Sequence, residues 1–322
     1  MRNMAGADAR IPTIRKLALA CAALVLAITS LSAFIRLSQA GLGCQPWPQC
    51  YAQSLEAAGQ RAAPPTEGAV AVARITHRVV AVAALLFVIA LVMMTLSKVP
   101  VLWREGRMAL GLLALALFLA ILGRWTTDAR VPAVMLGNLL GGFAMFALSW
   151  RLVESTGRQP AASPAQPGLA RWARIGLALL VAQIILGGLV SAGHAGLSCP
   201  RLPACDMAGG SWQLLNPWHE TPLDVSDSIN PAGALVHGLH RLGAVVVAAV
   251  LLPLGVAAWR GGRRAGIAVI LLLVVQAALG VLLVTGGLPL PMALAHNVTA
   301  ALLLAAVLGL AADDRRLPAG SR

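Results

Sequence analysis

Long apolar runs alternate with short polar segments along the whole chain. An α-helix needs about 20 predominantly apolar residues to cross the core of a bilayer, and each run has about that length. The first run is too long for a signal peptide and lacks a clear small-residue cleavage site, so we expect it to be retained. The pattern predicts an all-α integral membrane protein with eight transmembrane helices, over residues 15–35, 68–97, 105–123, 132–152, 171–192, 231–259, 264–285 and 291–311.

Composition supports the same class of protein. Hydrophobic residues make up 58% of the 322 residues and charged residues 11%, and the mean hydropathy is +0.79. A soluble domain of this length does not have such a composition. The chain therefore belongs within a membrane.

The net charge of +13 is explained by where the basic residues lie. Of the 25 Lys and Arg, 17 fall in the N-terminal segment, the C-terminal segment and the alternate loops at 98–107, 151–174 and 260–264. Only five fall in the segments on the opposite, outer side of the membrane. Cytoplasmic loops carry such an excess, so we predict a multi-pass protein of the bacterial inner membrane with both termini cytoplasmic. The charge indicates lipid headgroups, not nucleic acid, as the partner.

One motif occurs twice. Each copy is a pair of cysteines six positions apart, followed by a histidine–arginine pair in the next helix. The copies are Cys44, Cys50, His77 and Arg78, and then Cys199, Cys205, His240 and Arg241. The cysteines are offset by 155 residues (199−44) and the histidines by 163 (240−77). A long internal repeat of this kind predicts two pseudo-symmetric four-helix bundles. We assign them to residues 1–153 and 171–322, joined by a polar, proline-rich cytoplasmic linker at 154–170.

The four repeated cysteines fall in the predicted outer loops, at 36–67 and 193–230. The outer side of a bacterial inner membrane is oxidising, so each pair can form a disulfide within its loop. A zinc site would require four ligands at closer spacing, and a thiol–disulfide relay typically uses Cys-x-x-Cys. A structural clasp, open to redox change, is the simplest interpretation.

Three histidines lie at a common predicted depth in the membrane. His77, His240 and His296 are roughly 8–15 Å below the outer surface, at 1.5 Å per helical residue. Ionisable groups at such depths usually serve a function. Two imidazoles on facing helices suit the axial positions of haem iron, and Arg78 and Arg241 suit haem propionates. The alternative interpretation is that each histidine only forms an interhelical hydrogen bond.

The two halves differ in the last element of this repeat. His237 precedes His240 by three residues and is expected to line the same cavity. The position in the first half that matches His296 is Asn138, with an offset of 158 (296−138). We therefore predict iron ligation by His240 and His296, whereas His77 lacks an imidazole partner.

These motifs resemble the heme A synthase family over nearly the whole chain. The resemblance rests on Arg36-Leu-Ser-Gln-Ala-Gly-Leu-Gly-Cys44-Gln-Pro-Trp-Pro-Gln-Cys50, on His194-Ala-Gly-Leu-Ser-Cys199-Pro-Arg-Leu-Pro-Ala-Cys205, on the two His-Arg pairs and on His296. It implies that haem b lies between His240 and His296. It also implies that the first half takes haem O as substrate and oxidises a ring methyl to a formyl, giving haem A for terminal oxidases. A haem O supplier and the oxidase assembly machinery are the implied partners, and the first cysteine pair is implied in the redox chemistry.

Two positions depart from the family pattern. Arg74 stands where the family has the glutamate of Glu-x-x-His-Arg, and Asn138 replaces the second histidine of the first half. An iron held by His77 alone would keep an open position, with Asn138 able to hydrogen-bond an iron-bound water. Arg74 could orient the substrate but could not act as a base.

Three further functions remain as alternatives. One is a non-catalytic, haem-binding oxidase assembly factor with a degenerate first half. Another is a membrane thiol–disulfide oxidoreductase, which does not require three histidines at one depth. The last is a transporter, which the absence of an evident Gly/Pro-interrupted helix facing an ion site disfavours.

Overall fold

The computed structural model describes residues 2–38, 67–125, 131–157, 167–220 and 230–312, and within these ranges its regular elements are all helical. Eight helices are long and apolar enough to cross a membrane, as predicted. They are α1 (Arg2–Ser38), α3 (Glu67–Leu96), α4 (Trp103–Trp125), α5 (Pro132–Ser155), α6 (Pro167–Ala192), α7 (Ala234–Arg260), α8 (Arg264–Thr285) and α9 (Leu290–Ala311). Two single-turn 3-10 helices, η1 (Trp212–Leu215) and η2 (Pro231–Gly233), precede α7.

The observed helix bounds follow the hydropathy pattern, with shifts at the ends of several helices. α6 begins at Pro167, inside the predicted linker at 154–170, because the helix extends ahead of its apolar run. α1 begins at Arg2, well before the predicted start at 15, because the more polar residues ahead of the apolar run continue the same helix. Its membrane-compatible part covers Ala9–Ile35. The predicted start of the sixth helix at 231 falls in η2, and α7 itself begins at Ala234. Pro231 suits the opening position of such a turn because it has no N–H to leave unpaired.

The helices of each half pack in the same order. α1 contacts α3 and α5, and α4 contacts these same two helices. In the second half α6 contacts α7 and α9, and α8 contacts these same two. Between the halves, α5 packs on α6 and α9, and α1 packs on α9. If α1, α3, α4 and α5 are matched to α6, α7, α8 and α9, the α5–α6 contact corresponds to the α9–α1 contact, and the α5–α9 contact corresponds to itself. This pattern is consistent with the predicted pseudo-symmetry.

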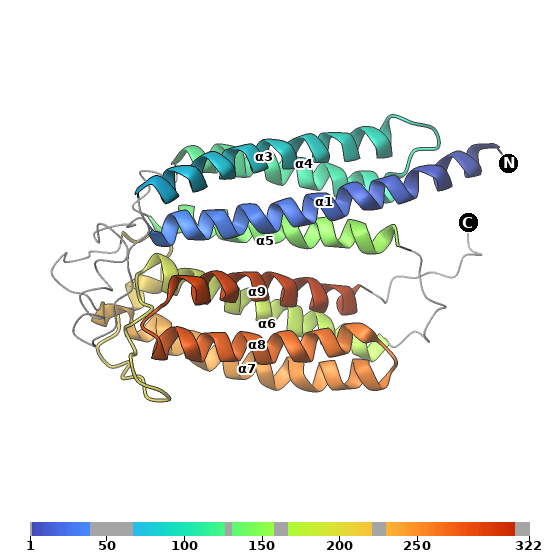
Figure 1. Cartoon of the computed structure of the whole chain (residues 1–322). Helices are drawn as coiled ribbons and strands as arrows, with labels where there is room; N and C mark the ends of the chain where they lie inside the picture. Colours follow the sequence, from blue (N-terminus) through green and yellow to red (C-terminus); the bar gives the residue numbers. More distant parts are fainter. Residues whose placement is uncertain (1, 39–66, 126–130, 158–166, 221–229, 313–322) are drawn as a thin grey trace.

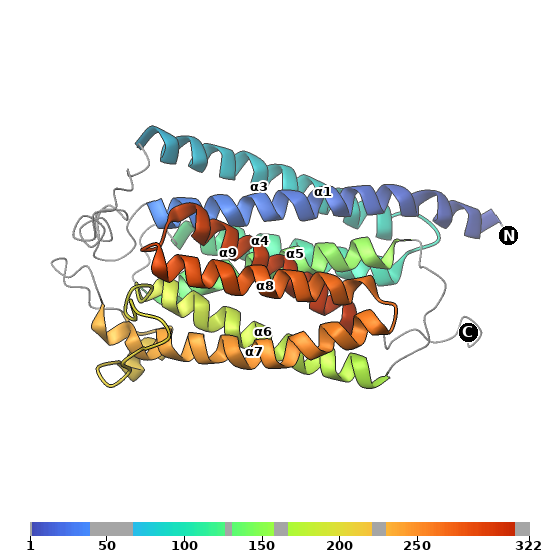
Figure 2. The same ribbon diagram turned by 60° about the horizontal axis from the view of Figure 1, so that its bottom comes forward.

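The helices lie side by side with their ends at two common levels (Figures 1 and 2). The start of α1 and the end of α9 lie at one end, together with the α3–α4 and α7–α8 connections. The segment between α6 and α7 and the turn between α8 and α9 lie at the other end. We call the latter the loop end; the predicted topology assigns it to the outer side.

One apolar cluster runs through both halves. It includes Val25 of α1, Phe146 of α5, Leu251 of α7 and Leu303 of α9, each at most 3% exposed. Glycines allow close approach at several contacts: a Cβ on Gly188 of α6 would lie 2.5 Å from Leu136 of α5. The halves are therefore joined by packed side chains.

Candidate functional site

The first turns of α7 carry the second copy of the repeated histidines. His237 is 4% exposed, while His240, one turn further into the membrane, is partly buried. Arg241 lies four residues after His237 on the same helix face, and its Nε donates a hydrogen bond to His237 Nε2 at 3.2 Å. The side chain of His237 is thus held by its own helix.

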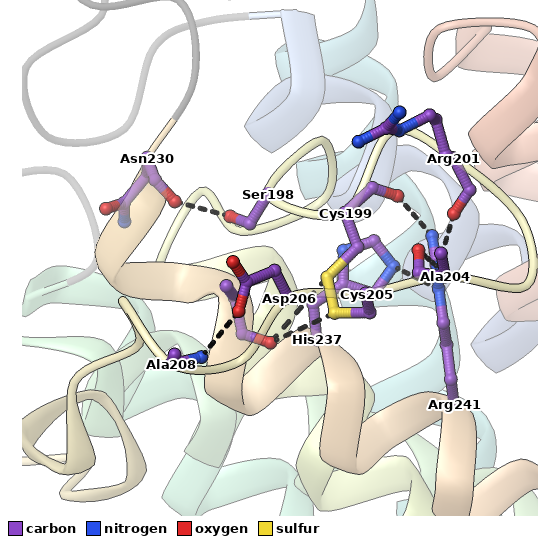
Figure 3. The surroundings of a disulfide bond; sticks show 11 residues. Ser198, Cys199, Arg201, Ala204, Cys205, Asp206, Ala208, Asn230, His237 and Arg241 are labelled. Carbon is purple, nitrogen blue, oxygen red and sulfur yellow. Dashed lines mark hydrogen bonds between the residues drawn. A yellow bond between two sulfur atoms is a disulfide. The ribbon is translucent and has the colours of Figure 1, made fainter.

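The remaining guanidinium donors of Arg241 bind the loop between α6 and η1. Nη1 donates to the carbonyl oxygens of Arg201 (2.9 Å) and Ala204 (3.3 Å), and Nη2 donates to that of Cys199. Figure 3 shows the guanidinium reaching up from α7 into this loop. In this structure Arg241 therefore clamps the loop onto the helix; its predicted role as a propionate ligand stays a prediction.

A disulfide closes the same loop. Cys199 and Cys205 are bonded to each other, as predicted for the second cysteine pair (Figure 3). Their sulfurs lie 3.7 and 3.5 Å from the carbonyl oxygen of Ala234, at the start of α7. A disulfide has no S–H to donate, so we treat these as close contacts. The first pair, Cys44 and Cys50, lies outside the described residues.

A hollow opens on the outer surface of this loop. Its volume is about 450 Å³, and the lining includes Cys199, Arg201, Cys205 and Asp206. It lies above α7 at the loop end and not between the helices (Figure 3). It is therefore separate from the histidines deeper in the bundle.

His240 is held by a glutamine from the neighbouring helix α6. Gln183 Nε2 donates to the backbone oxygen of His240 at 2.8 Å and lies 3.0 Å from the ring nitrogen Nδ1. Gly187, one turn beyond Gln183, faces the same ring, since a Cβ there would lie 2.9 Å from His240 Cε1. Within the described residues no hydrogen bond is made to His240 Nε2, which leaves this nitrogen available to a ligand.

His296 of α9 has a similar environment on α8. Gln276 Nε2 lies 3.0 Å from His296 Nε2, and a Cβ on Gly280 would lie 3.6 Å from His296 Cε1. In the described part of the chain His296 Nδ1 is buried without a hydrogen-bond partner.

The second half brings together two histidines that are compatible with holding a haem. The two imidazoles come from α7 and α9, which each pack on both α6 and α8. Each ring packs against a glycine of the neighbouring helix, which lets the imidazole approach that helix closely. The carbonyl oxygens of Gln183 and Gln276, like His296 Nδ1, are buried without partners among the described residues. Buried polar atoms are normally satisfied, so these orphaned atoms favour a ligand or rearrangement at this level of the bundle.

The first half is arranged differently. His77 of α3 is partly buried, while Arg74 and Arg78 on the same helix are exposed. Asn138 of α5 donates from Nδ2 to Ser32 Oγ of α1 at 3.2 Å. The amide of Asn138, at the position where a second histidine was expected, thus contacts α1. The positions predicted for substrate binding lie on α3 and α5, which both pack on α1.

Sequence reasoning missed Gln183, Gln276 and Ser32. A signal for the glutamines was present, since Gln183-x3-Gly187 recurs as Gln276-x3-Gly280 with an offset of 93 (276−183). Ser32 carried no signal, because its role depends on which helix lies opposite.

Comparison with known proteins connects these features to one family. Residues 15–308 match the family model described as cytochrome oxidase assembly protein. A heme A synthase of Shewanella oneidensis is 31% identical over 309 residues, covering 87% of this chain and 90% of that protein. Heme A synthases of Methylobacterium nodulans (32% identical; 68% and 71% covered) and Rhizorhabdus wittichii (32% identical; 53% and 48% covered) are also similar.

Proposed function

This chain belongs to the heme A synthase family, whose members are membrane oxidoreductases of haem A biosynthesis and cytochrome oxidase assembly, and we propose that it converts haem O to haem A. The reaction oxidises a ring methyl group to a formyl group. The observation that carries the proposal is the pair of imidazoles, His240 and His296, each set between a glutamine and a glycine within a helix bundle.

His240 and His296 are the residues that would hold haem b in the second half. When bound, haem b would supply a one-electron carrier within the membrane. The chain's own contribution there is to bring two imidazoles from different helices to one level. His237 and Arg241 act at the loop end of the same site, where they join α7 to the disulfide loop.

The first half is the proposed substrate site. Replacing a methyl by a formyl group takes up the oxygen of one water molecule and releases four protons and four electrons. We assign the electrons to a membrane-soluble acceptor of the quinone class. His77 is the only imidazole proposed to face haem O, and Asn138 would hydrogen-bond the attacking water once released from Ser32. Arg78 and Arg74, exposed on α3, would bind the substrate's propionates.

The proposed location is the bacterial inner membrane with both termini cytoplasmic. The start of α1, the end of α9 and the basic connections at 98–107 and 260–264 share one end of the bundle (Figure 1), and basic residues favour the cytoplasmic side. Lipid surrounds the apolar helix faces. A supplier of haem O and the terminal oxidase assembly machinery are the proposed partners.

Co-expression with a haem O source tests the activity directly. Extracted haems are separated by chromatography, and we expect haem A to accumulate with the native chain. The His77→Ala variant should retain less than about a hundredth of the haem A yield, as expected for loss of a catalytic group. His219→Ala is the control, because His219 lies in the loop between η1 and η2, outside the spanning helices.

A second candidate function is a haem-binding assembly factor without catalysis. The contact of Asn138 with Ser32 favours it, because the amide that replaces a histidine is already engaged. In that case the native chain would still show a b-type spectrum, but haem O would remain unchanged in the extraction. The same experiment therefore separates the two functions.

A further inference from the structure

Helices α6 and α8 carry the same short pattern toward different histidines. Gln183 and Gly187 are four residues apart on α6, as are Gln276 and Gly280 on α8, so each pair shares a helix face. Each glutamine amide lies 3.0 Å from one imidazole nitrogen, and each glycine faces the Cε1 atom of the same ring. The two amides, however, contact different nitrogens.

Gln183 contacts the Nδ1 nitrogen of His240 and not the Nε2 nitrogen. Gln183 Nε2 reaches Nδ1 and also donates to the His240 backbone oxygen at 2.8 Å, which fixes the amide to the helix as well as to the ring. Nε2 is left without a protein partner among the described residues. At His296 the arrangement is reversed, since Gln276 holds Nε2 and leaves Nδ1 buried and unpartnered.

We propose that Gln183 is the positioning residue that orients His240 for iron, and that Gln276 occupies the iron-binding nitrogen of His296 until haem displaces it. This inference rests on the proposed function, which places haem b between the two histidines. Metal-ligating histidines commonly donate their second ring N–H to a fixed acceptor, and that bond sets ring orientation and ligand basicity.

The amide of Gln183 is suited to both states of His240. In the present arrangement it donates to Nδ1, so the ring proton is on Nε2. Ligation of iron through Nε2 moves the proton to Nδ1, which then requires an acceptor. Gln183 Oε1 is buried without a partner among the described residues. A half-turn about the last side-chain bond would present it to Nδ1–H, in exchange for the hydrogen bond from Nε2 to the His240 backbone oxygen.

Haemin titration of the purified full-length chain in detergent tests the proposal. We expect Gln183→Leu to bind haemin roughly 10–100-fold more weakly, as for other residues that support a metal ligand. The midpoint potential of the bound haem should rise, because loss of the Nδ1–H acceptor makes His240 a weaker electron donor. Gln276→Leu should bind haemin at least as tightly as the native chain, since nothing then competes for His296 Nε2. Gln213→Leu, on the outer loop, is the substitution control.

The glycines provide an independent arm of the test. A Cβ on Gly187 would press on His240 Cε1 at 2.9 Å, whereas one on Gly280 would make an ordinary contact with His296 at 3.6 Å. We therefore expect Gly187→Ala to weaken haemin binding or broaden the low-spin electron paramagnetic resonance signal. Gly280→Ala should match the native chain. Equal effects of the two alanines would contradict the assigned ring positions.

Two outcomes overturn the proposal. One is a folded Gln183→Leu variant with native affinity and potential; the other is an equal loss of affinity in Gln276→Leu. If Gln183→Leu does not accumulate, Gln183→Glu keeps the acceptor and should lower the potential instead of raising it. Survival of the haem spectrum in His240→Ala would instead refute the ligand set of the proposed function. A spectrum that depends on His240 but not on Gln183 would refute this inference alone.

Discussion

Arg241 shows how one side chain can join a loop to a membrane helix. Its guanidinium contacts the carbonyl oxygens of Cys199, Arg201 and Ala204 as well as His237 Nε2. Arginine offers donors in a rigid fork, so it can satisfy several acceptors at once. The loop carbonyls would otherwise lack these partners, and the disulfide loop would be less firmly held over the start of α7.

We expect Arg241→Ala to expose the Cys199–Cys205 disulfide to reductant. Loss of the charge-assisted hydrogen bonds should cost about 1.5 kcal/mol or more of local stability, so reduction by a small thiol should be roughly tenfold faster. Thiol alkylation followed by mass spectrometry measures the rate. Arg201→Ala is the matched control, because Arg201 contributes its carbonyl oxygen, which the substitution retains. Equal rates in the two variants would contradict the clamp.

The histidine pair makes a second prediction at the scale of single residues. We expect the native chain to show a low-spin b-type α-band after reduction with dithionite, and His240→Ala or His296→Ala to lose it. Each substitution removes one of two proposed axial ligands, and the remaining imidazole cannot by itself give the low-spin state. A band that persists in both variants would refute the assignment; His219→Ala should leave it unchanged.

At the scale of helices, α7 and α8 approach each other closely at a pair of glycines, Gly255 and Gly266. A Cβ on Gly266 of α8 would lie 2.5 Å from the backbone oxygen of Gly255 and 2.5 Å from the backbone nitrogen of Trp259, both on α7. Backbone atoms cannot swing away as a flexible side chain can. The register of α7 against α8, and with it the placement of His240 relative to Gln276, depends on this contact.

We expect Gly266→Ala to lower the free energy of unfolding by about 1–3 kcal/mol, the range for overpacking a tight contact. Thermal unfolding in detergent, followed by circular dichroism, measures the effect. Gly123→Ala on α4 is the control, because among the described residues a Cβ there meets nothing within 4 Å, and alanine favours the helical state. If Gly266→Ala unfolds at the same temperature as the native chain, the close α7–α8 approach is wrong.

The whole molecule places its helix ends in a pattern that reporter fusions can test. Eight crossings put the start of α1 and the end of α9 at one end and the disulfide loop at the other (Figure 2). With the basic segments in the cytoplasm, alkaline phosphatase fused after Trp218 should be active, and fusion after Arg260 should be inactive. The opposite pattern of activities would invert the proposed orientation without changing the fold.

The sequence alone predicted more of the fold than of the candidate site. Hydropathy predicted all eight helices, since the bilayer requires long apolar segments with internally bonded backbones. Spacing and depth also singled out His237, His240 and His296, whose roles stay predictions. The repeat predicted the Cys199–Cys205 bond, which the structure confirms. Hydropathy missed the early start of α1, because helical hydrogen bonding continues through polar residues that hydropathy scores as loop.

The partners of the site residues required the tertiary structure. The hydrogen-bond partners depend on which helices are neighbours and on how each helix is rotated about its axis. This holds for the acceptors of Arg241, for the ring nitrogen that each glutamine contacts, and for the contact of Asn138 with Ser32. Apolar helix faces are equally compatible with lipid, so they do not fix the rotation of a helix about its axis. Close packing at glycines and hydrogen bonds between polar side chains fix it. The chain by itself thus determined a duplicated eight-helix membrane protein with candidate haem ligands. Only the packed bundle decided that His240 and His296 are held by Gln183 and Gln276, because a hydrogen bond forms only where two helices bring its atoms together.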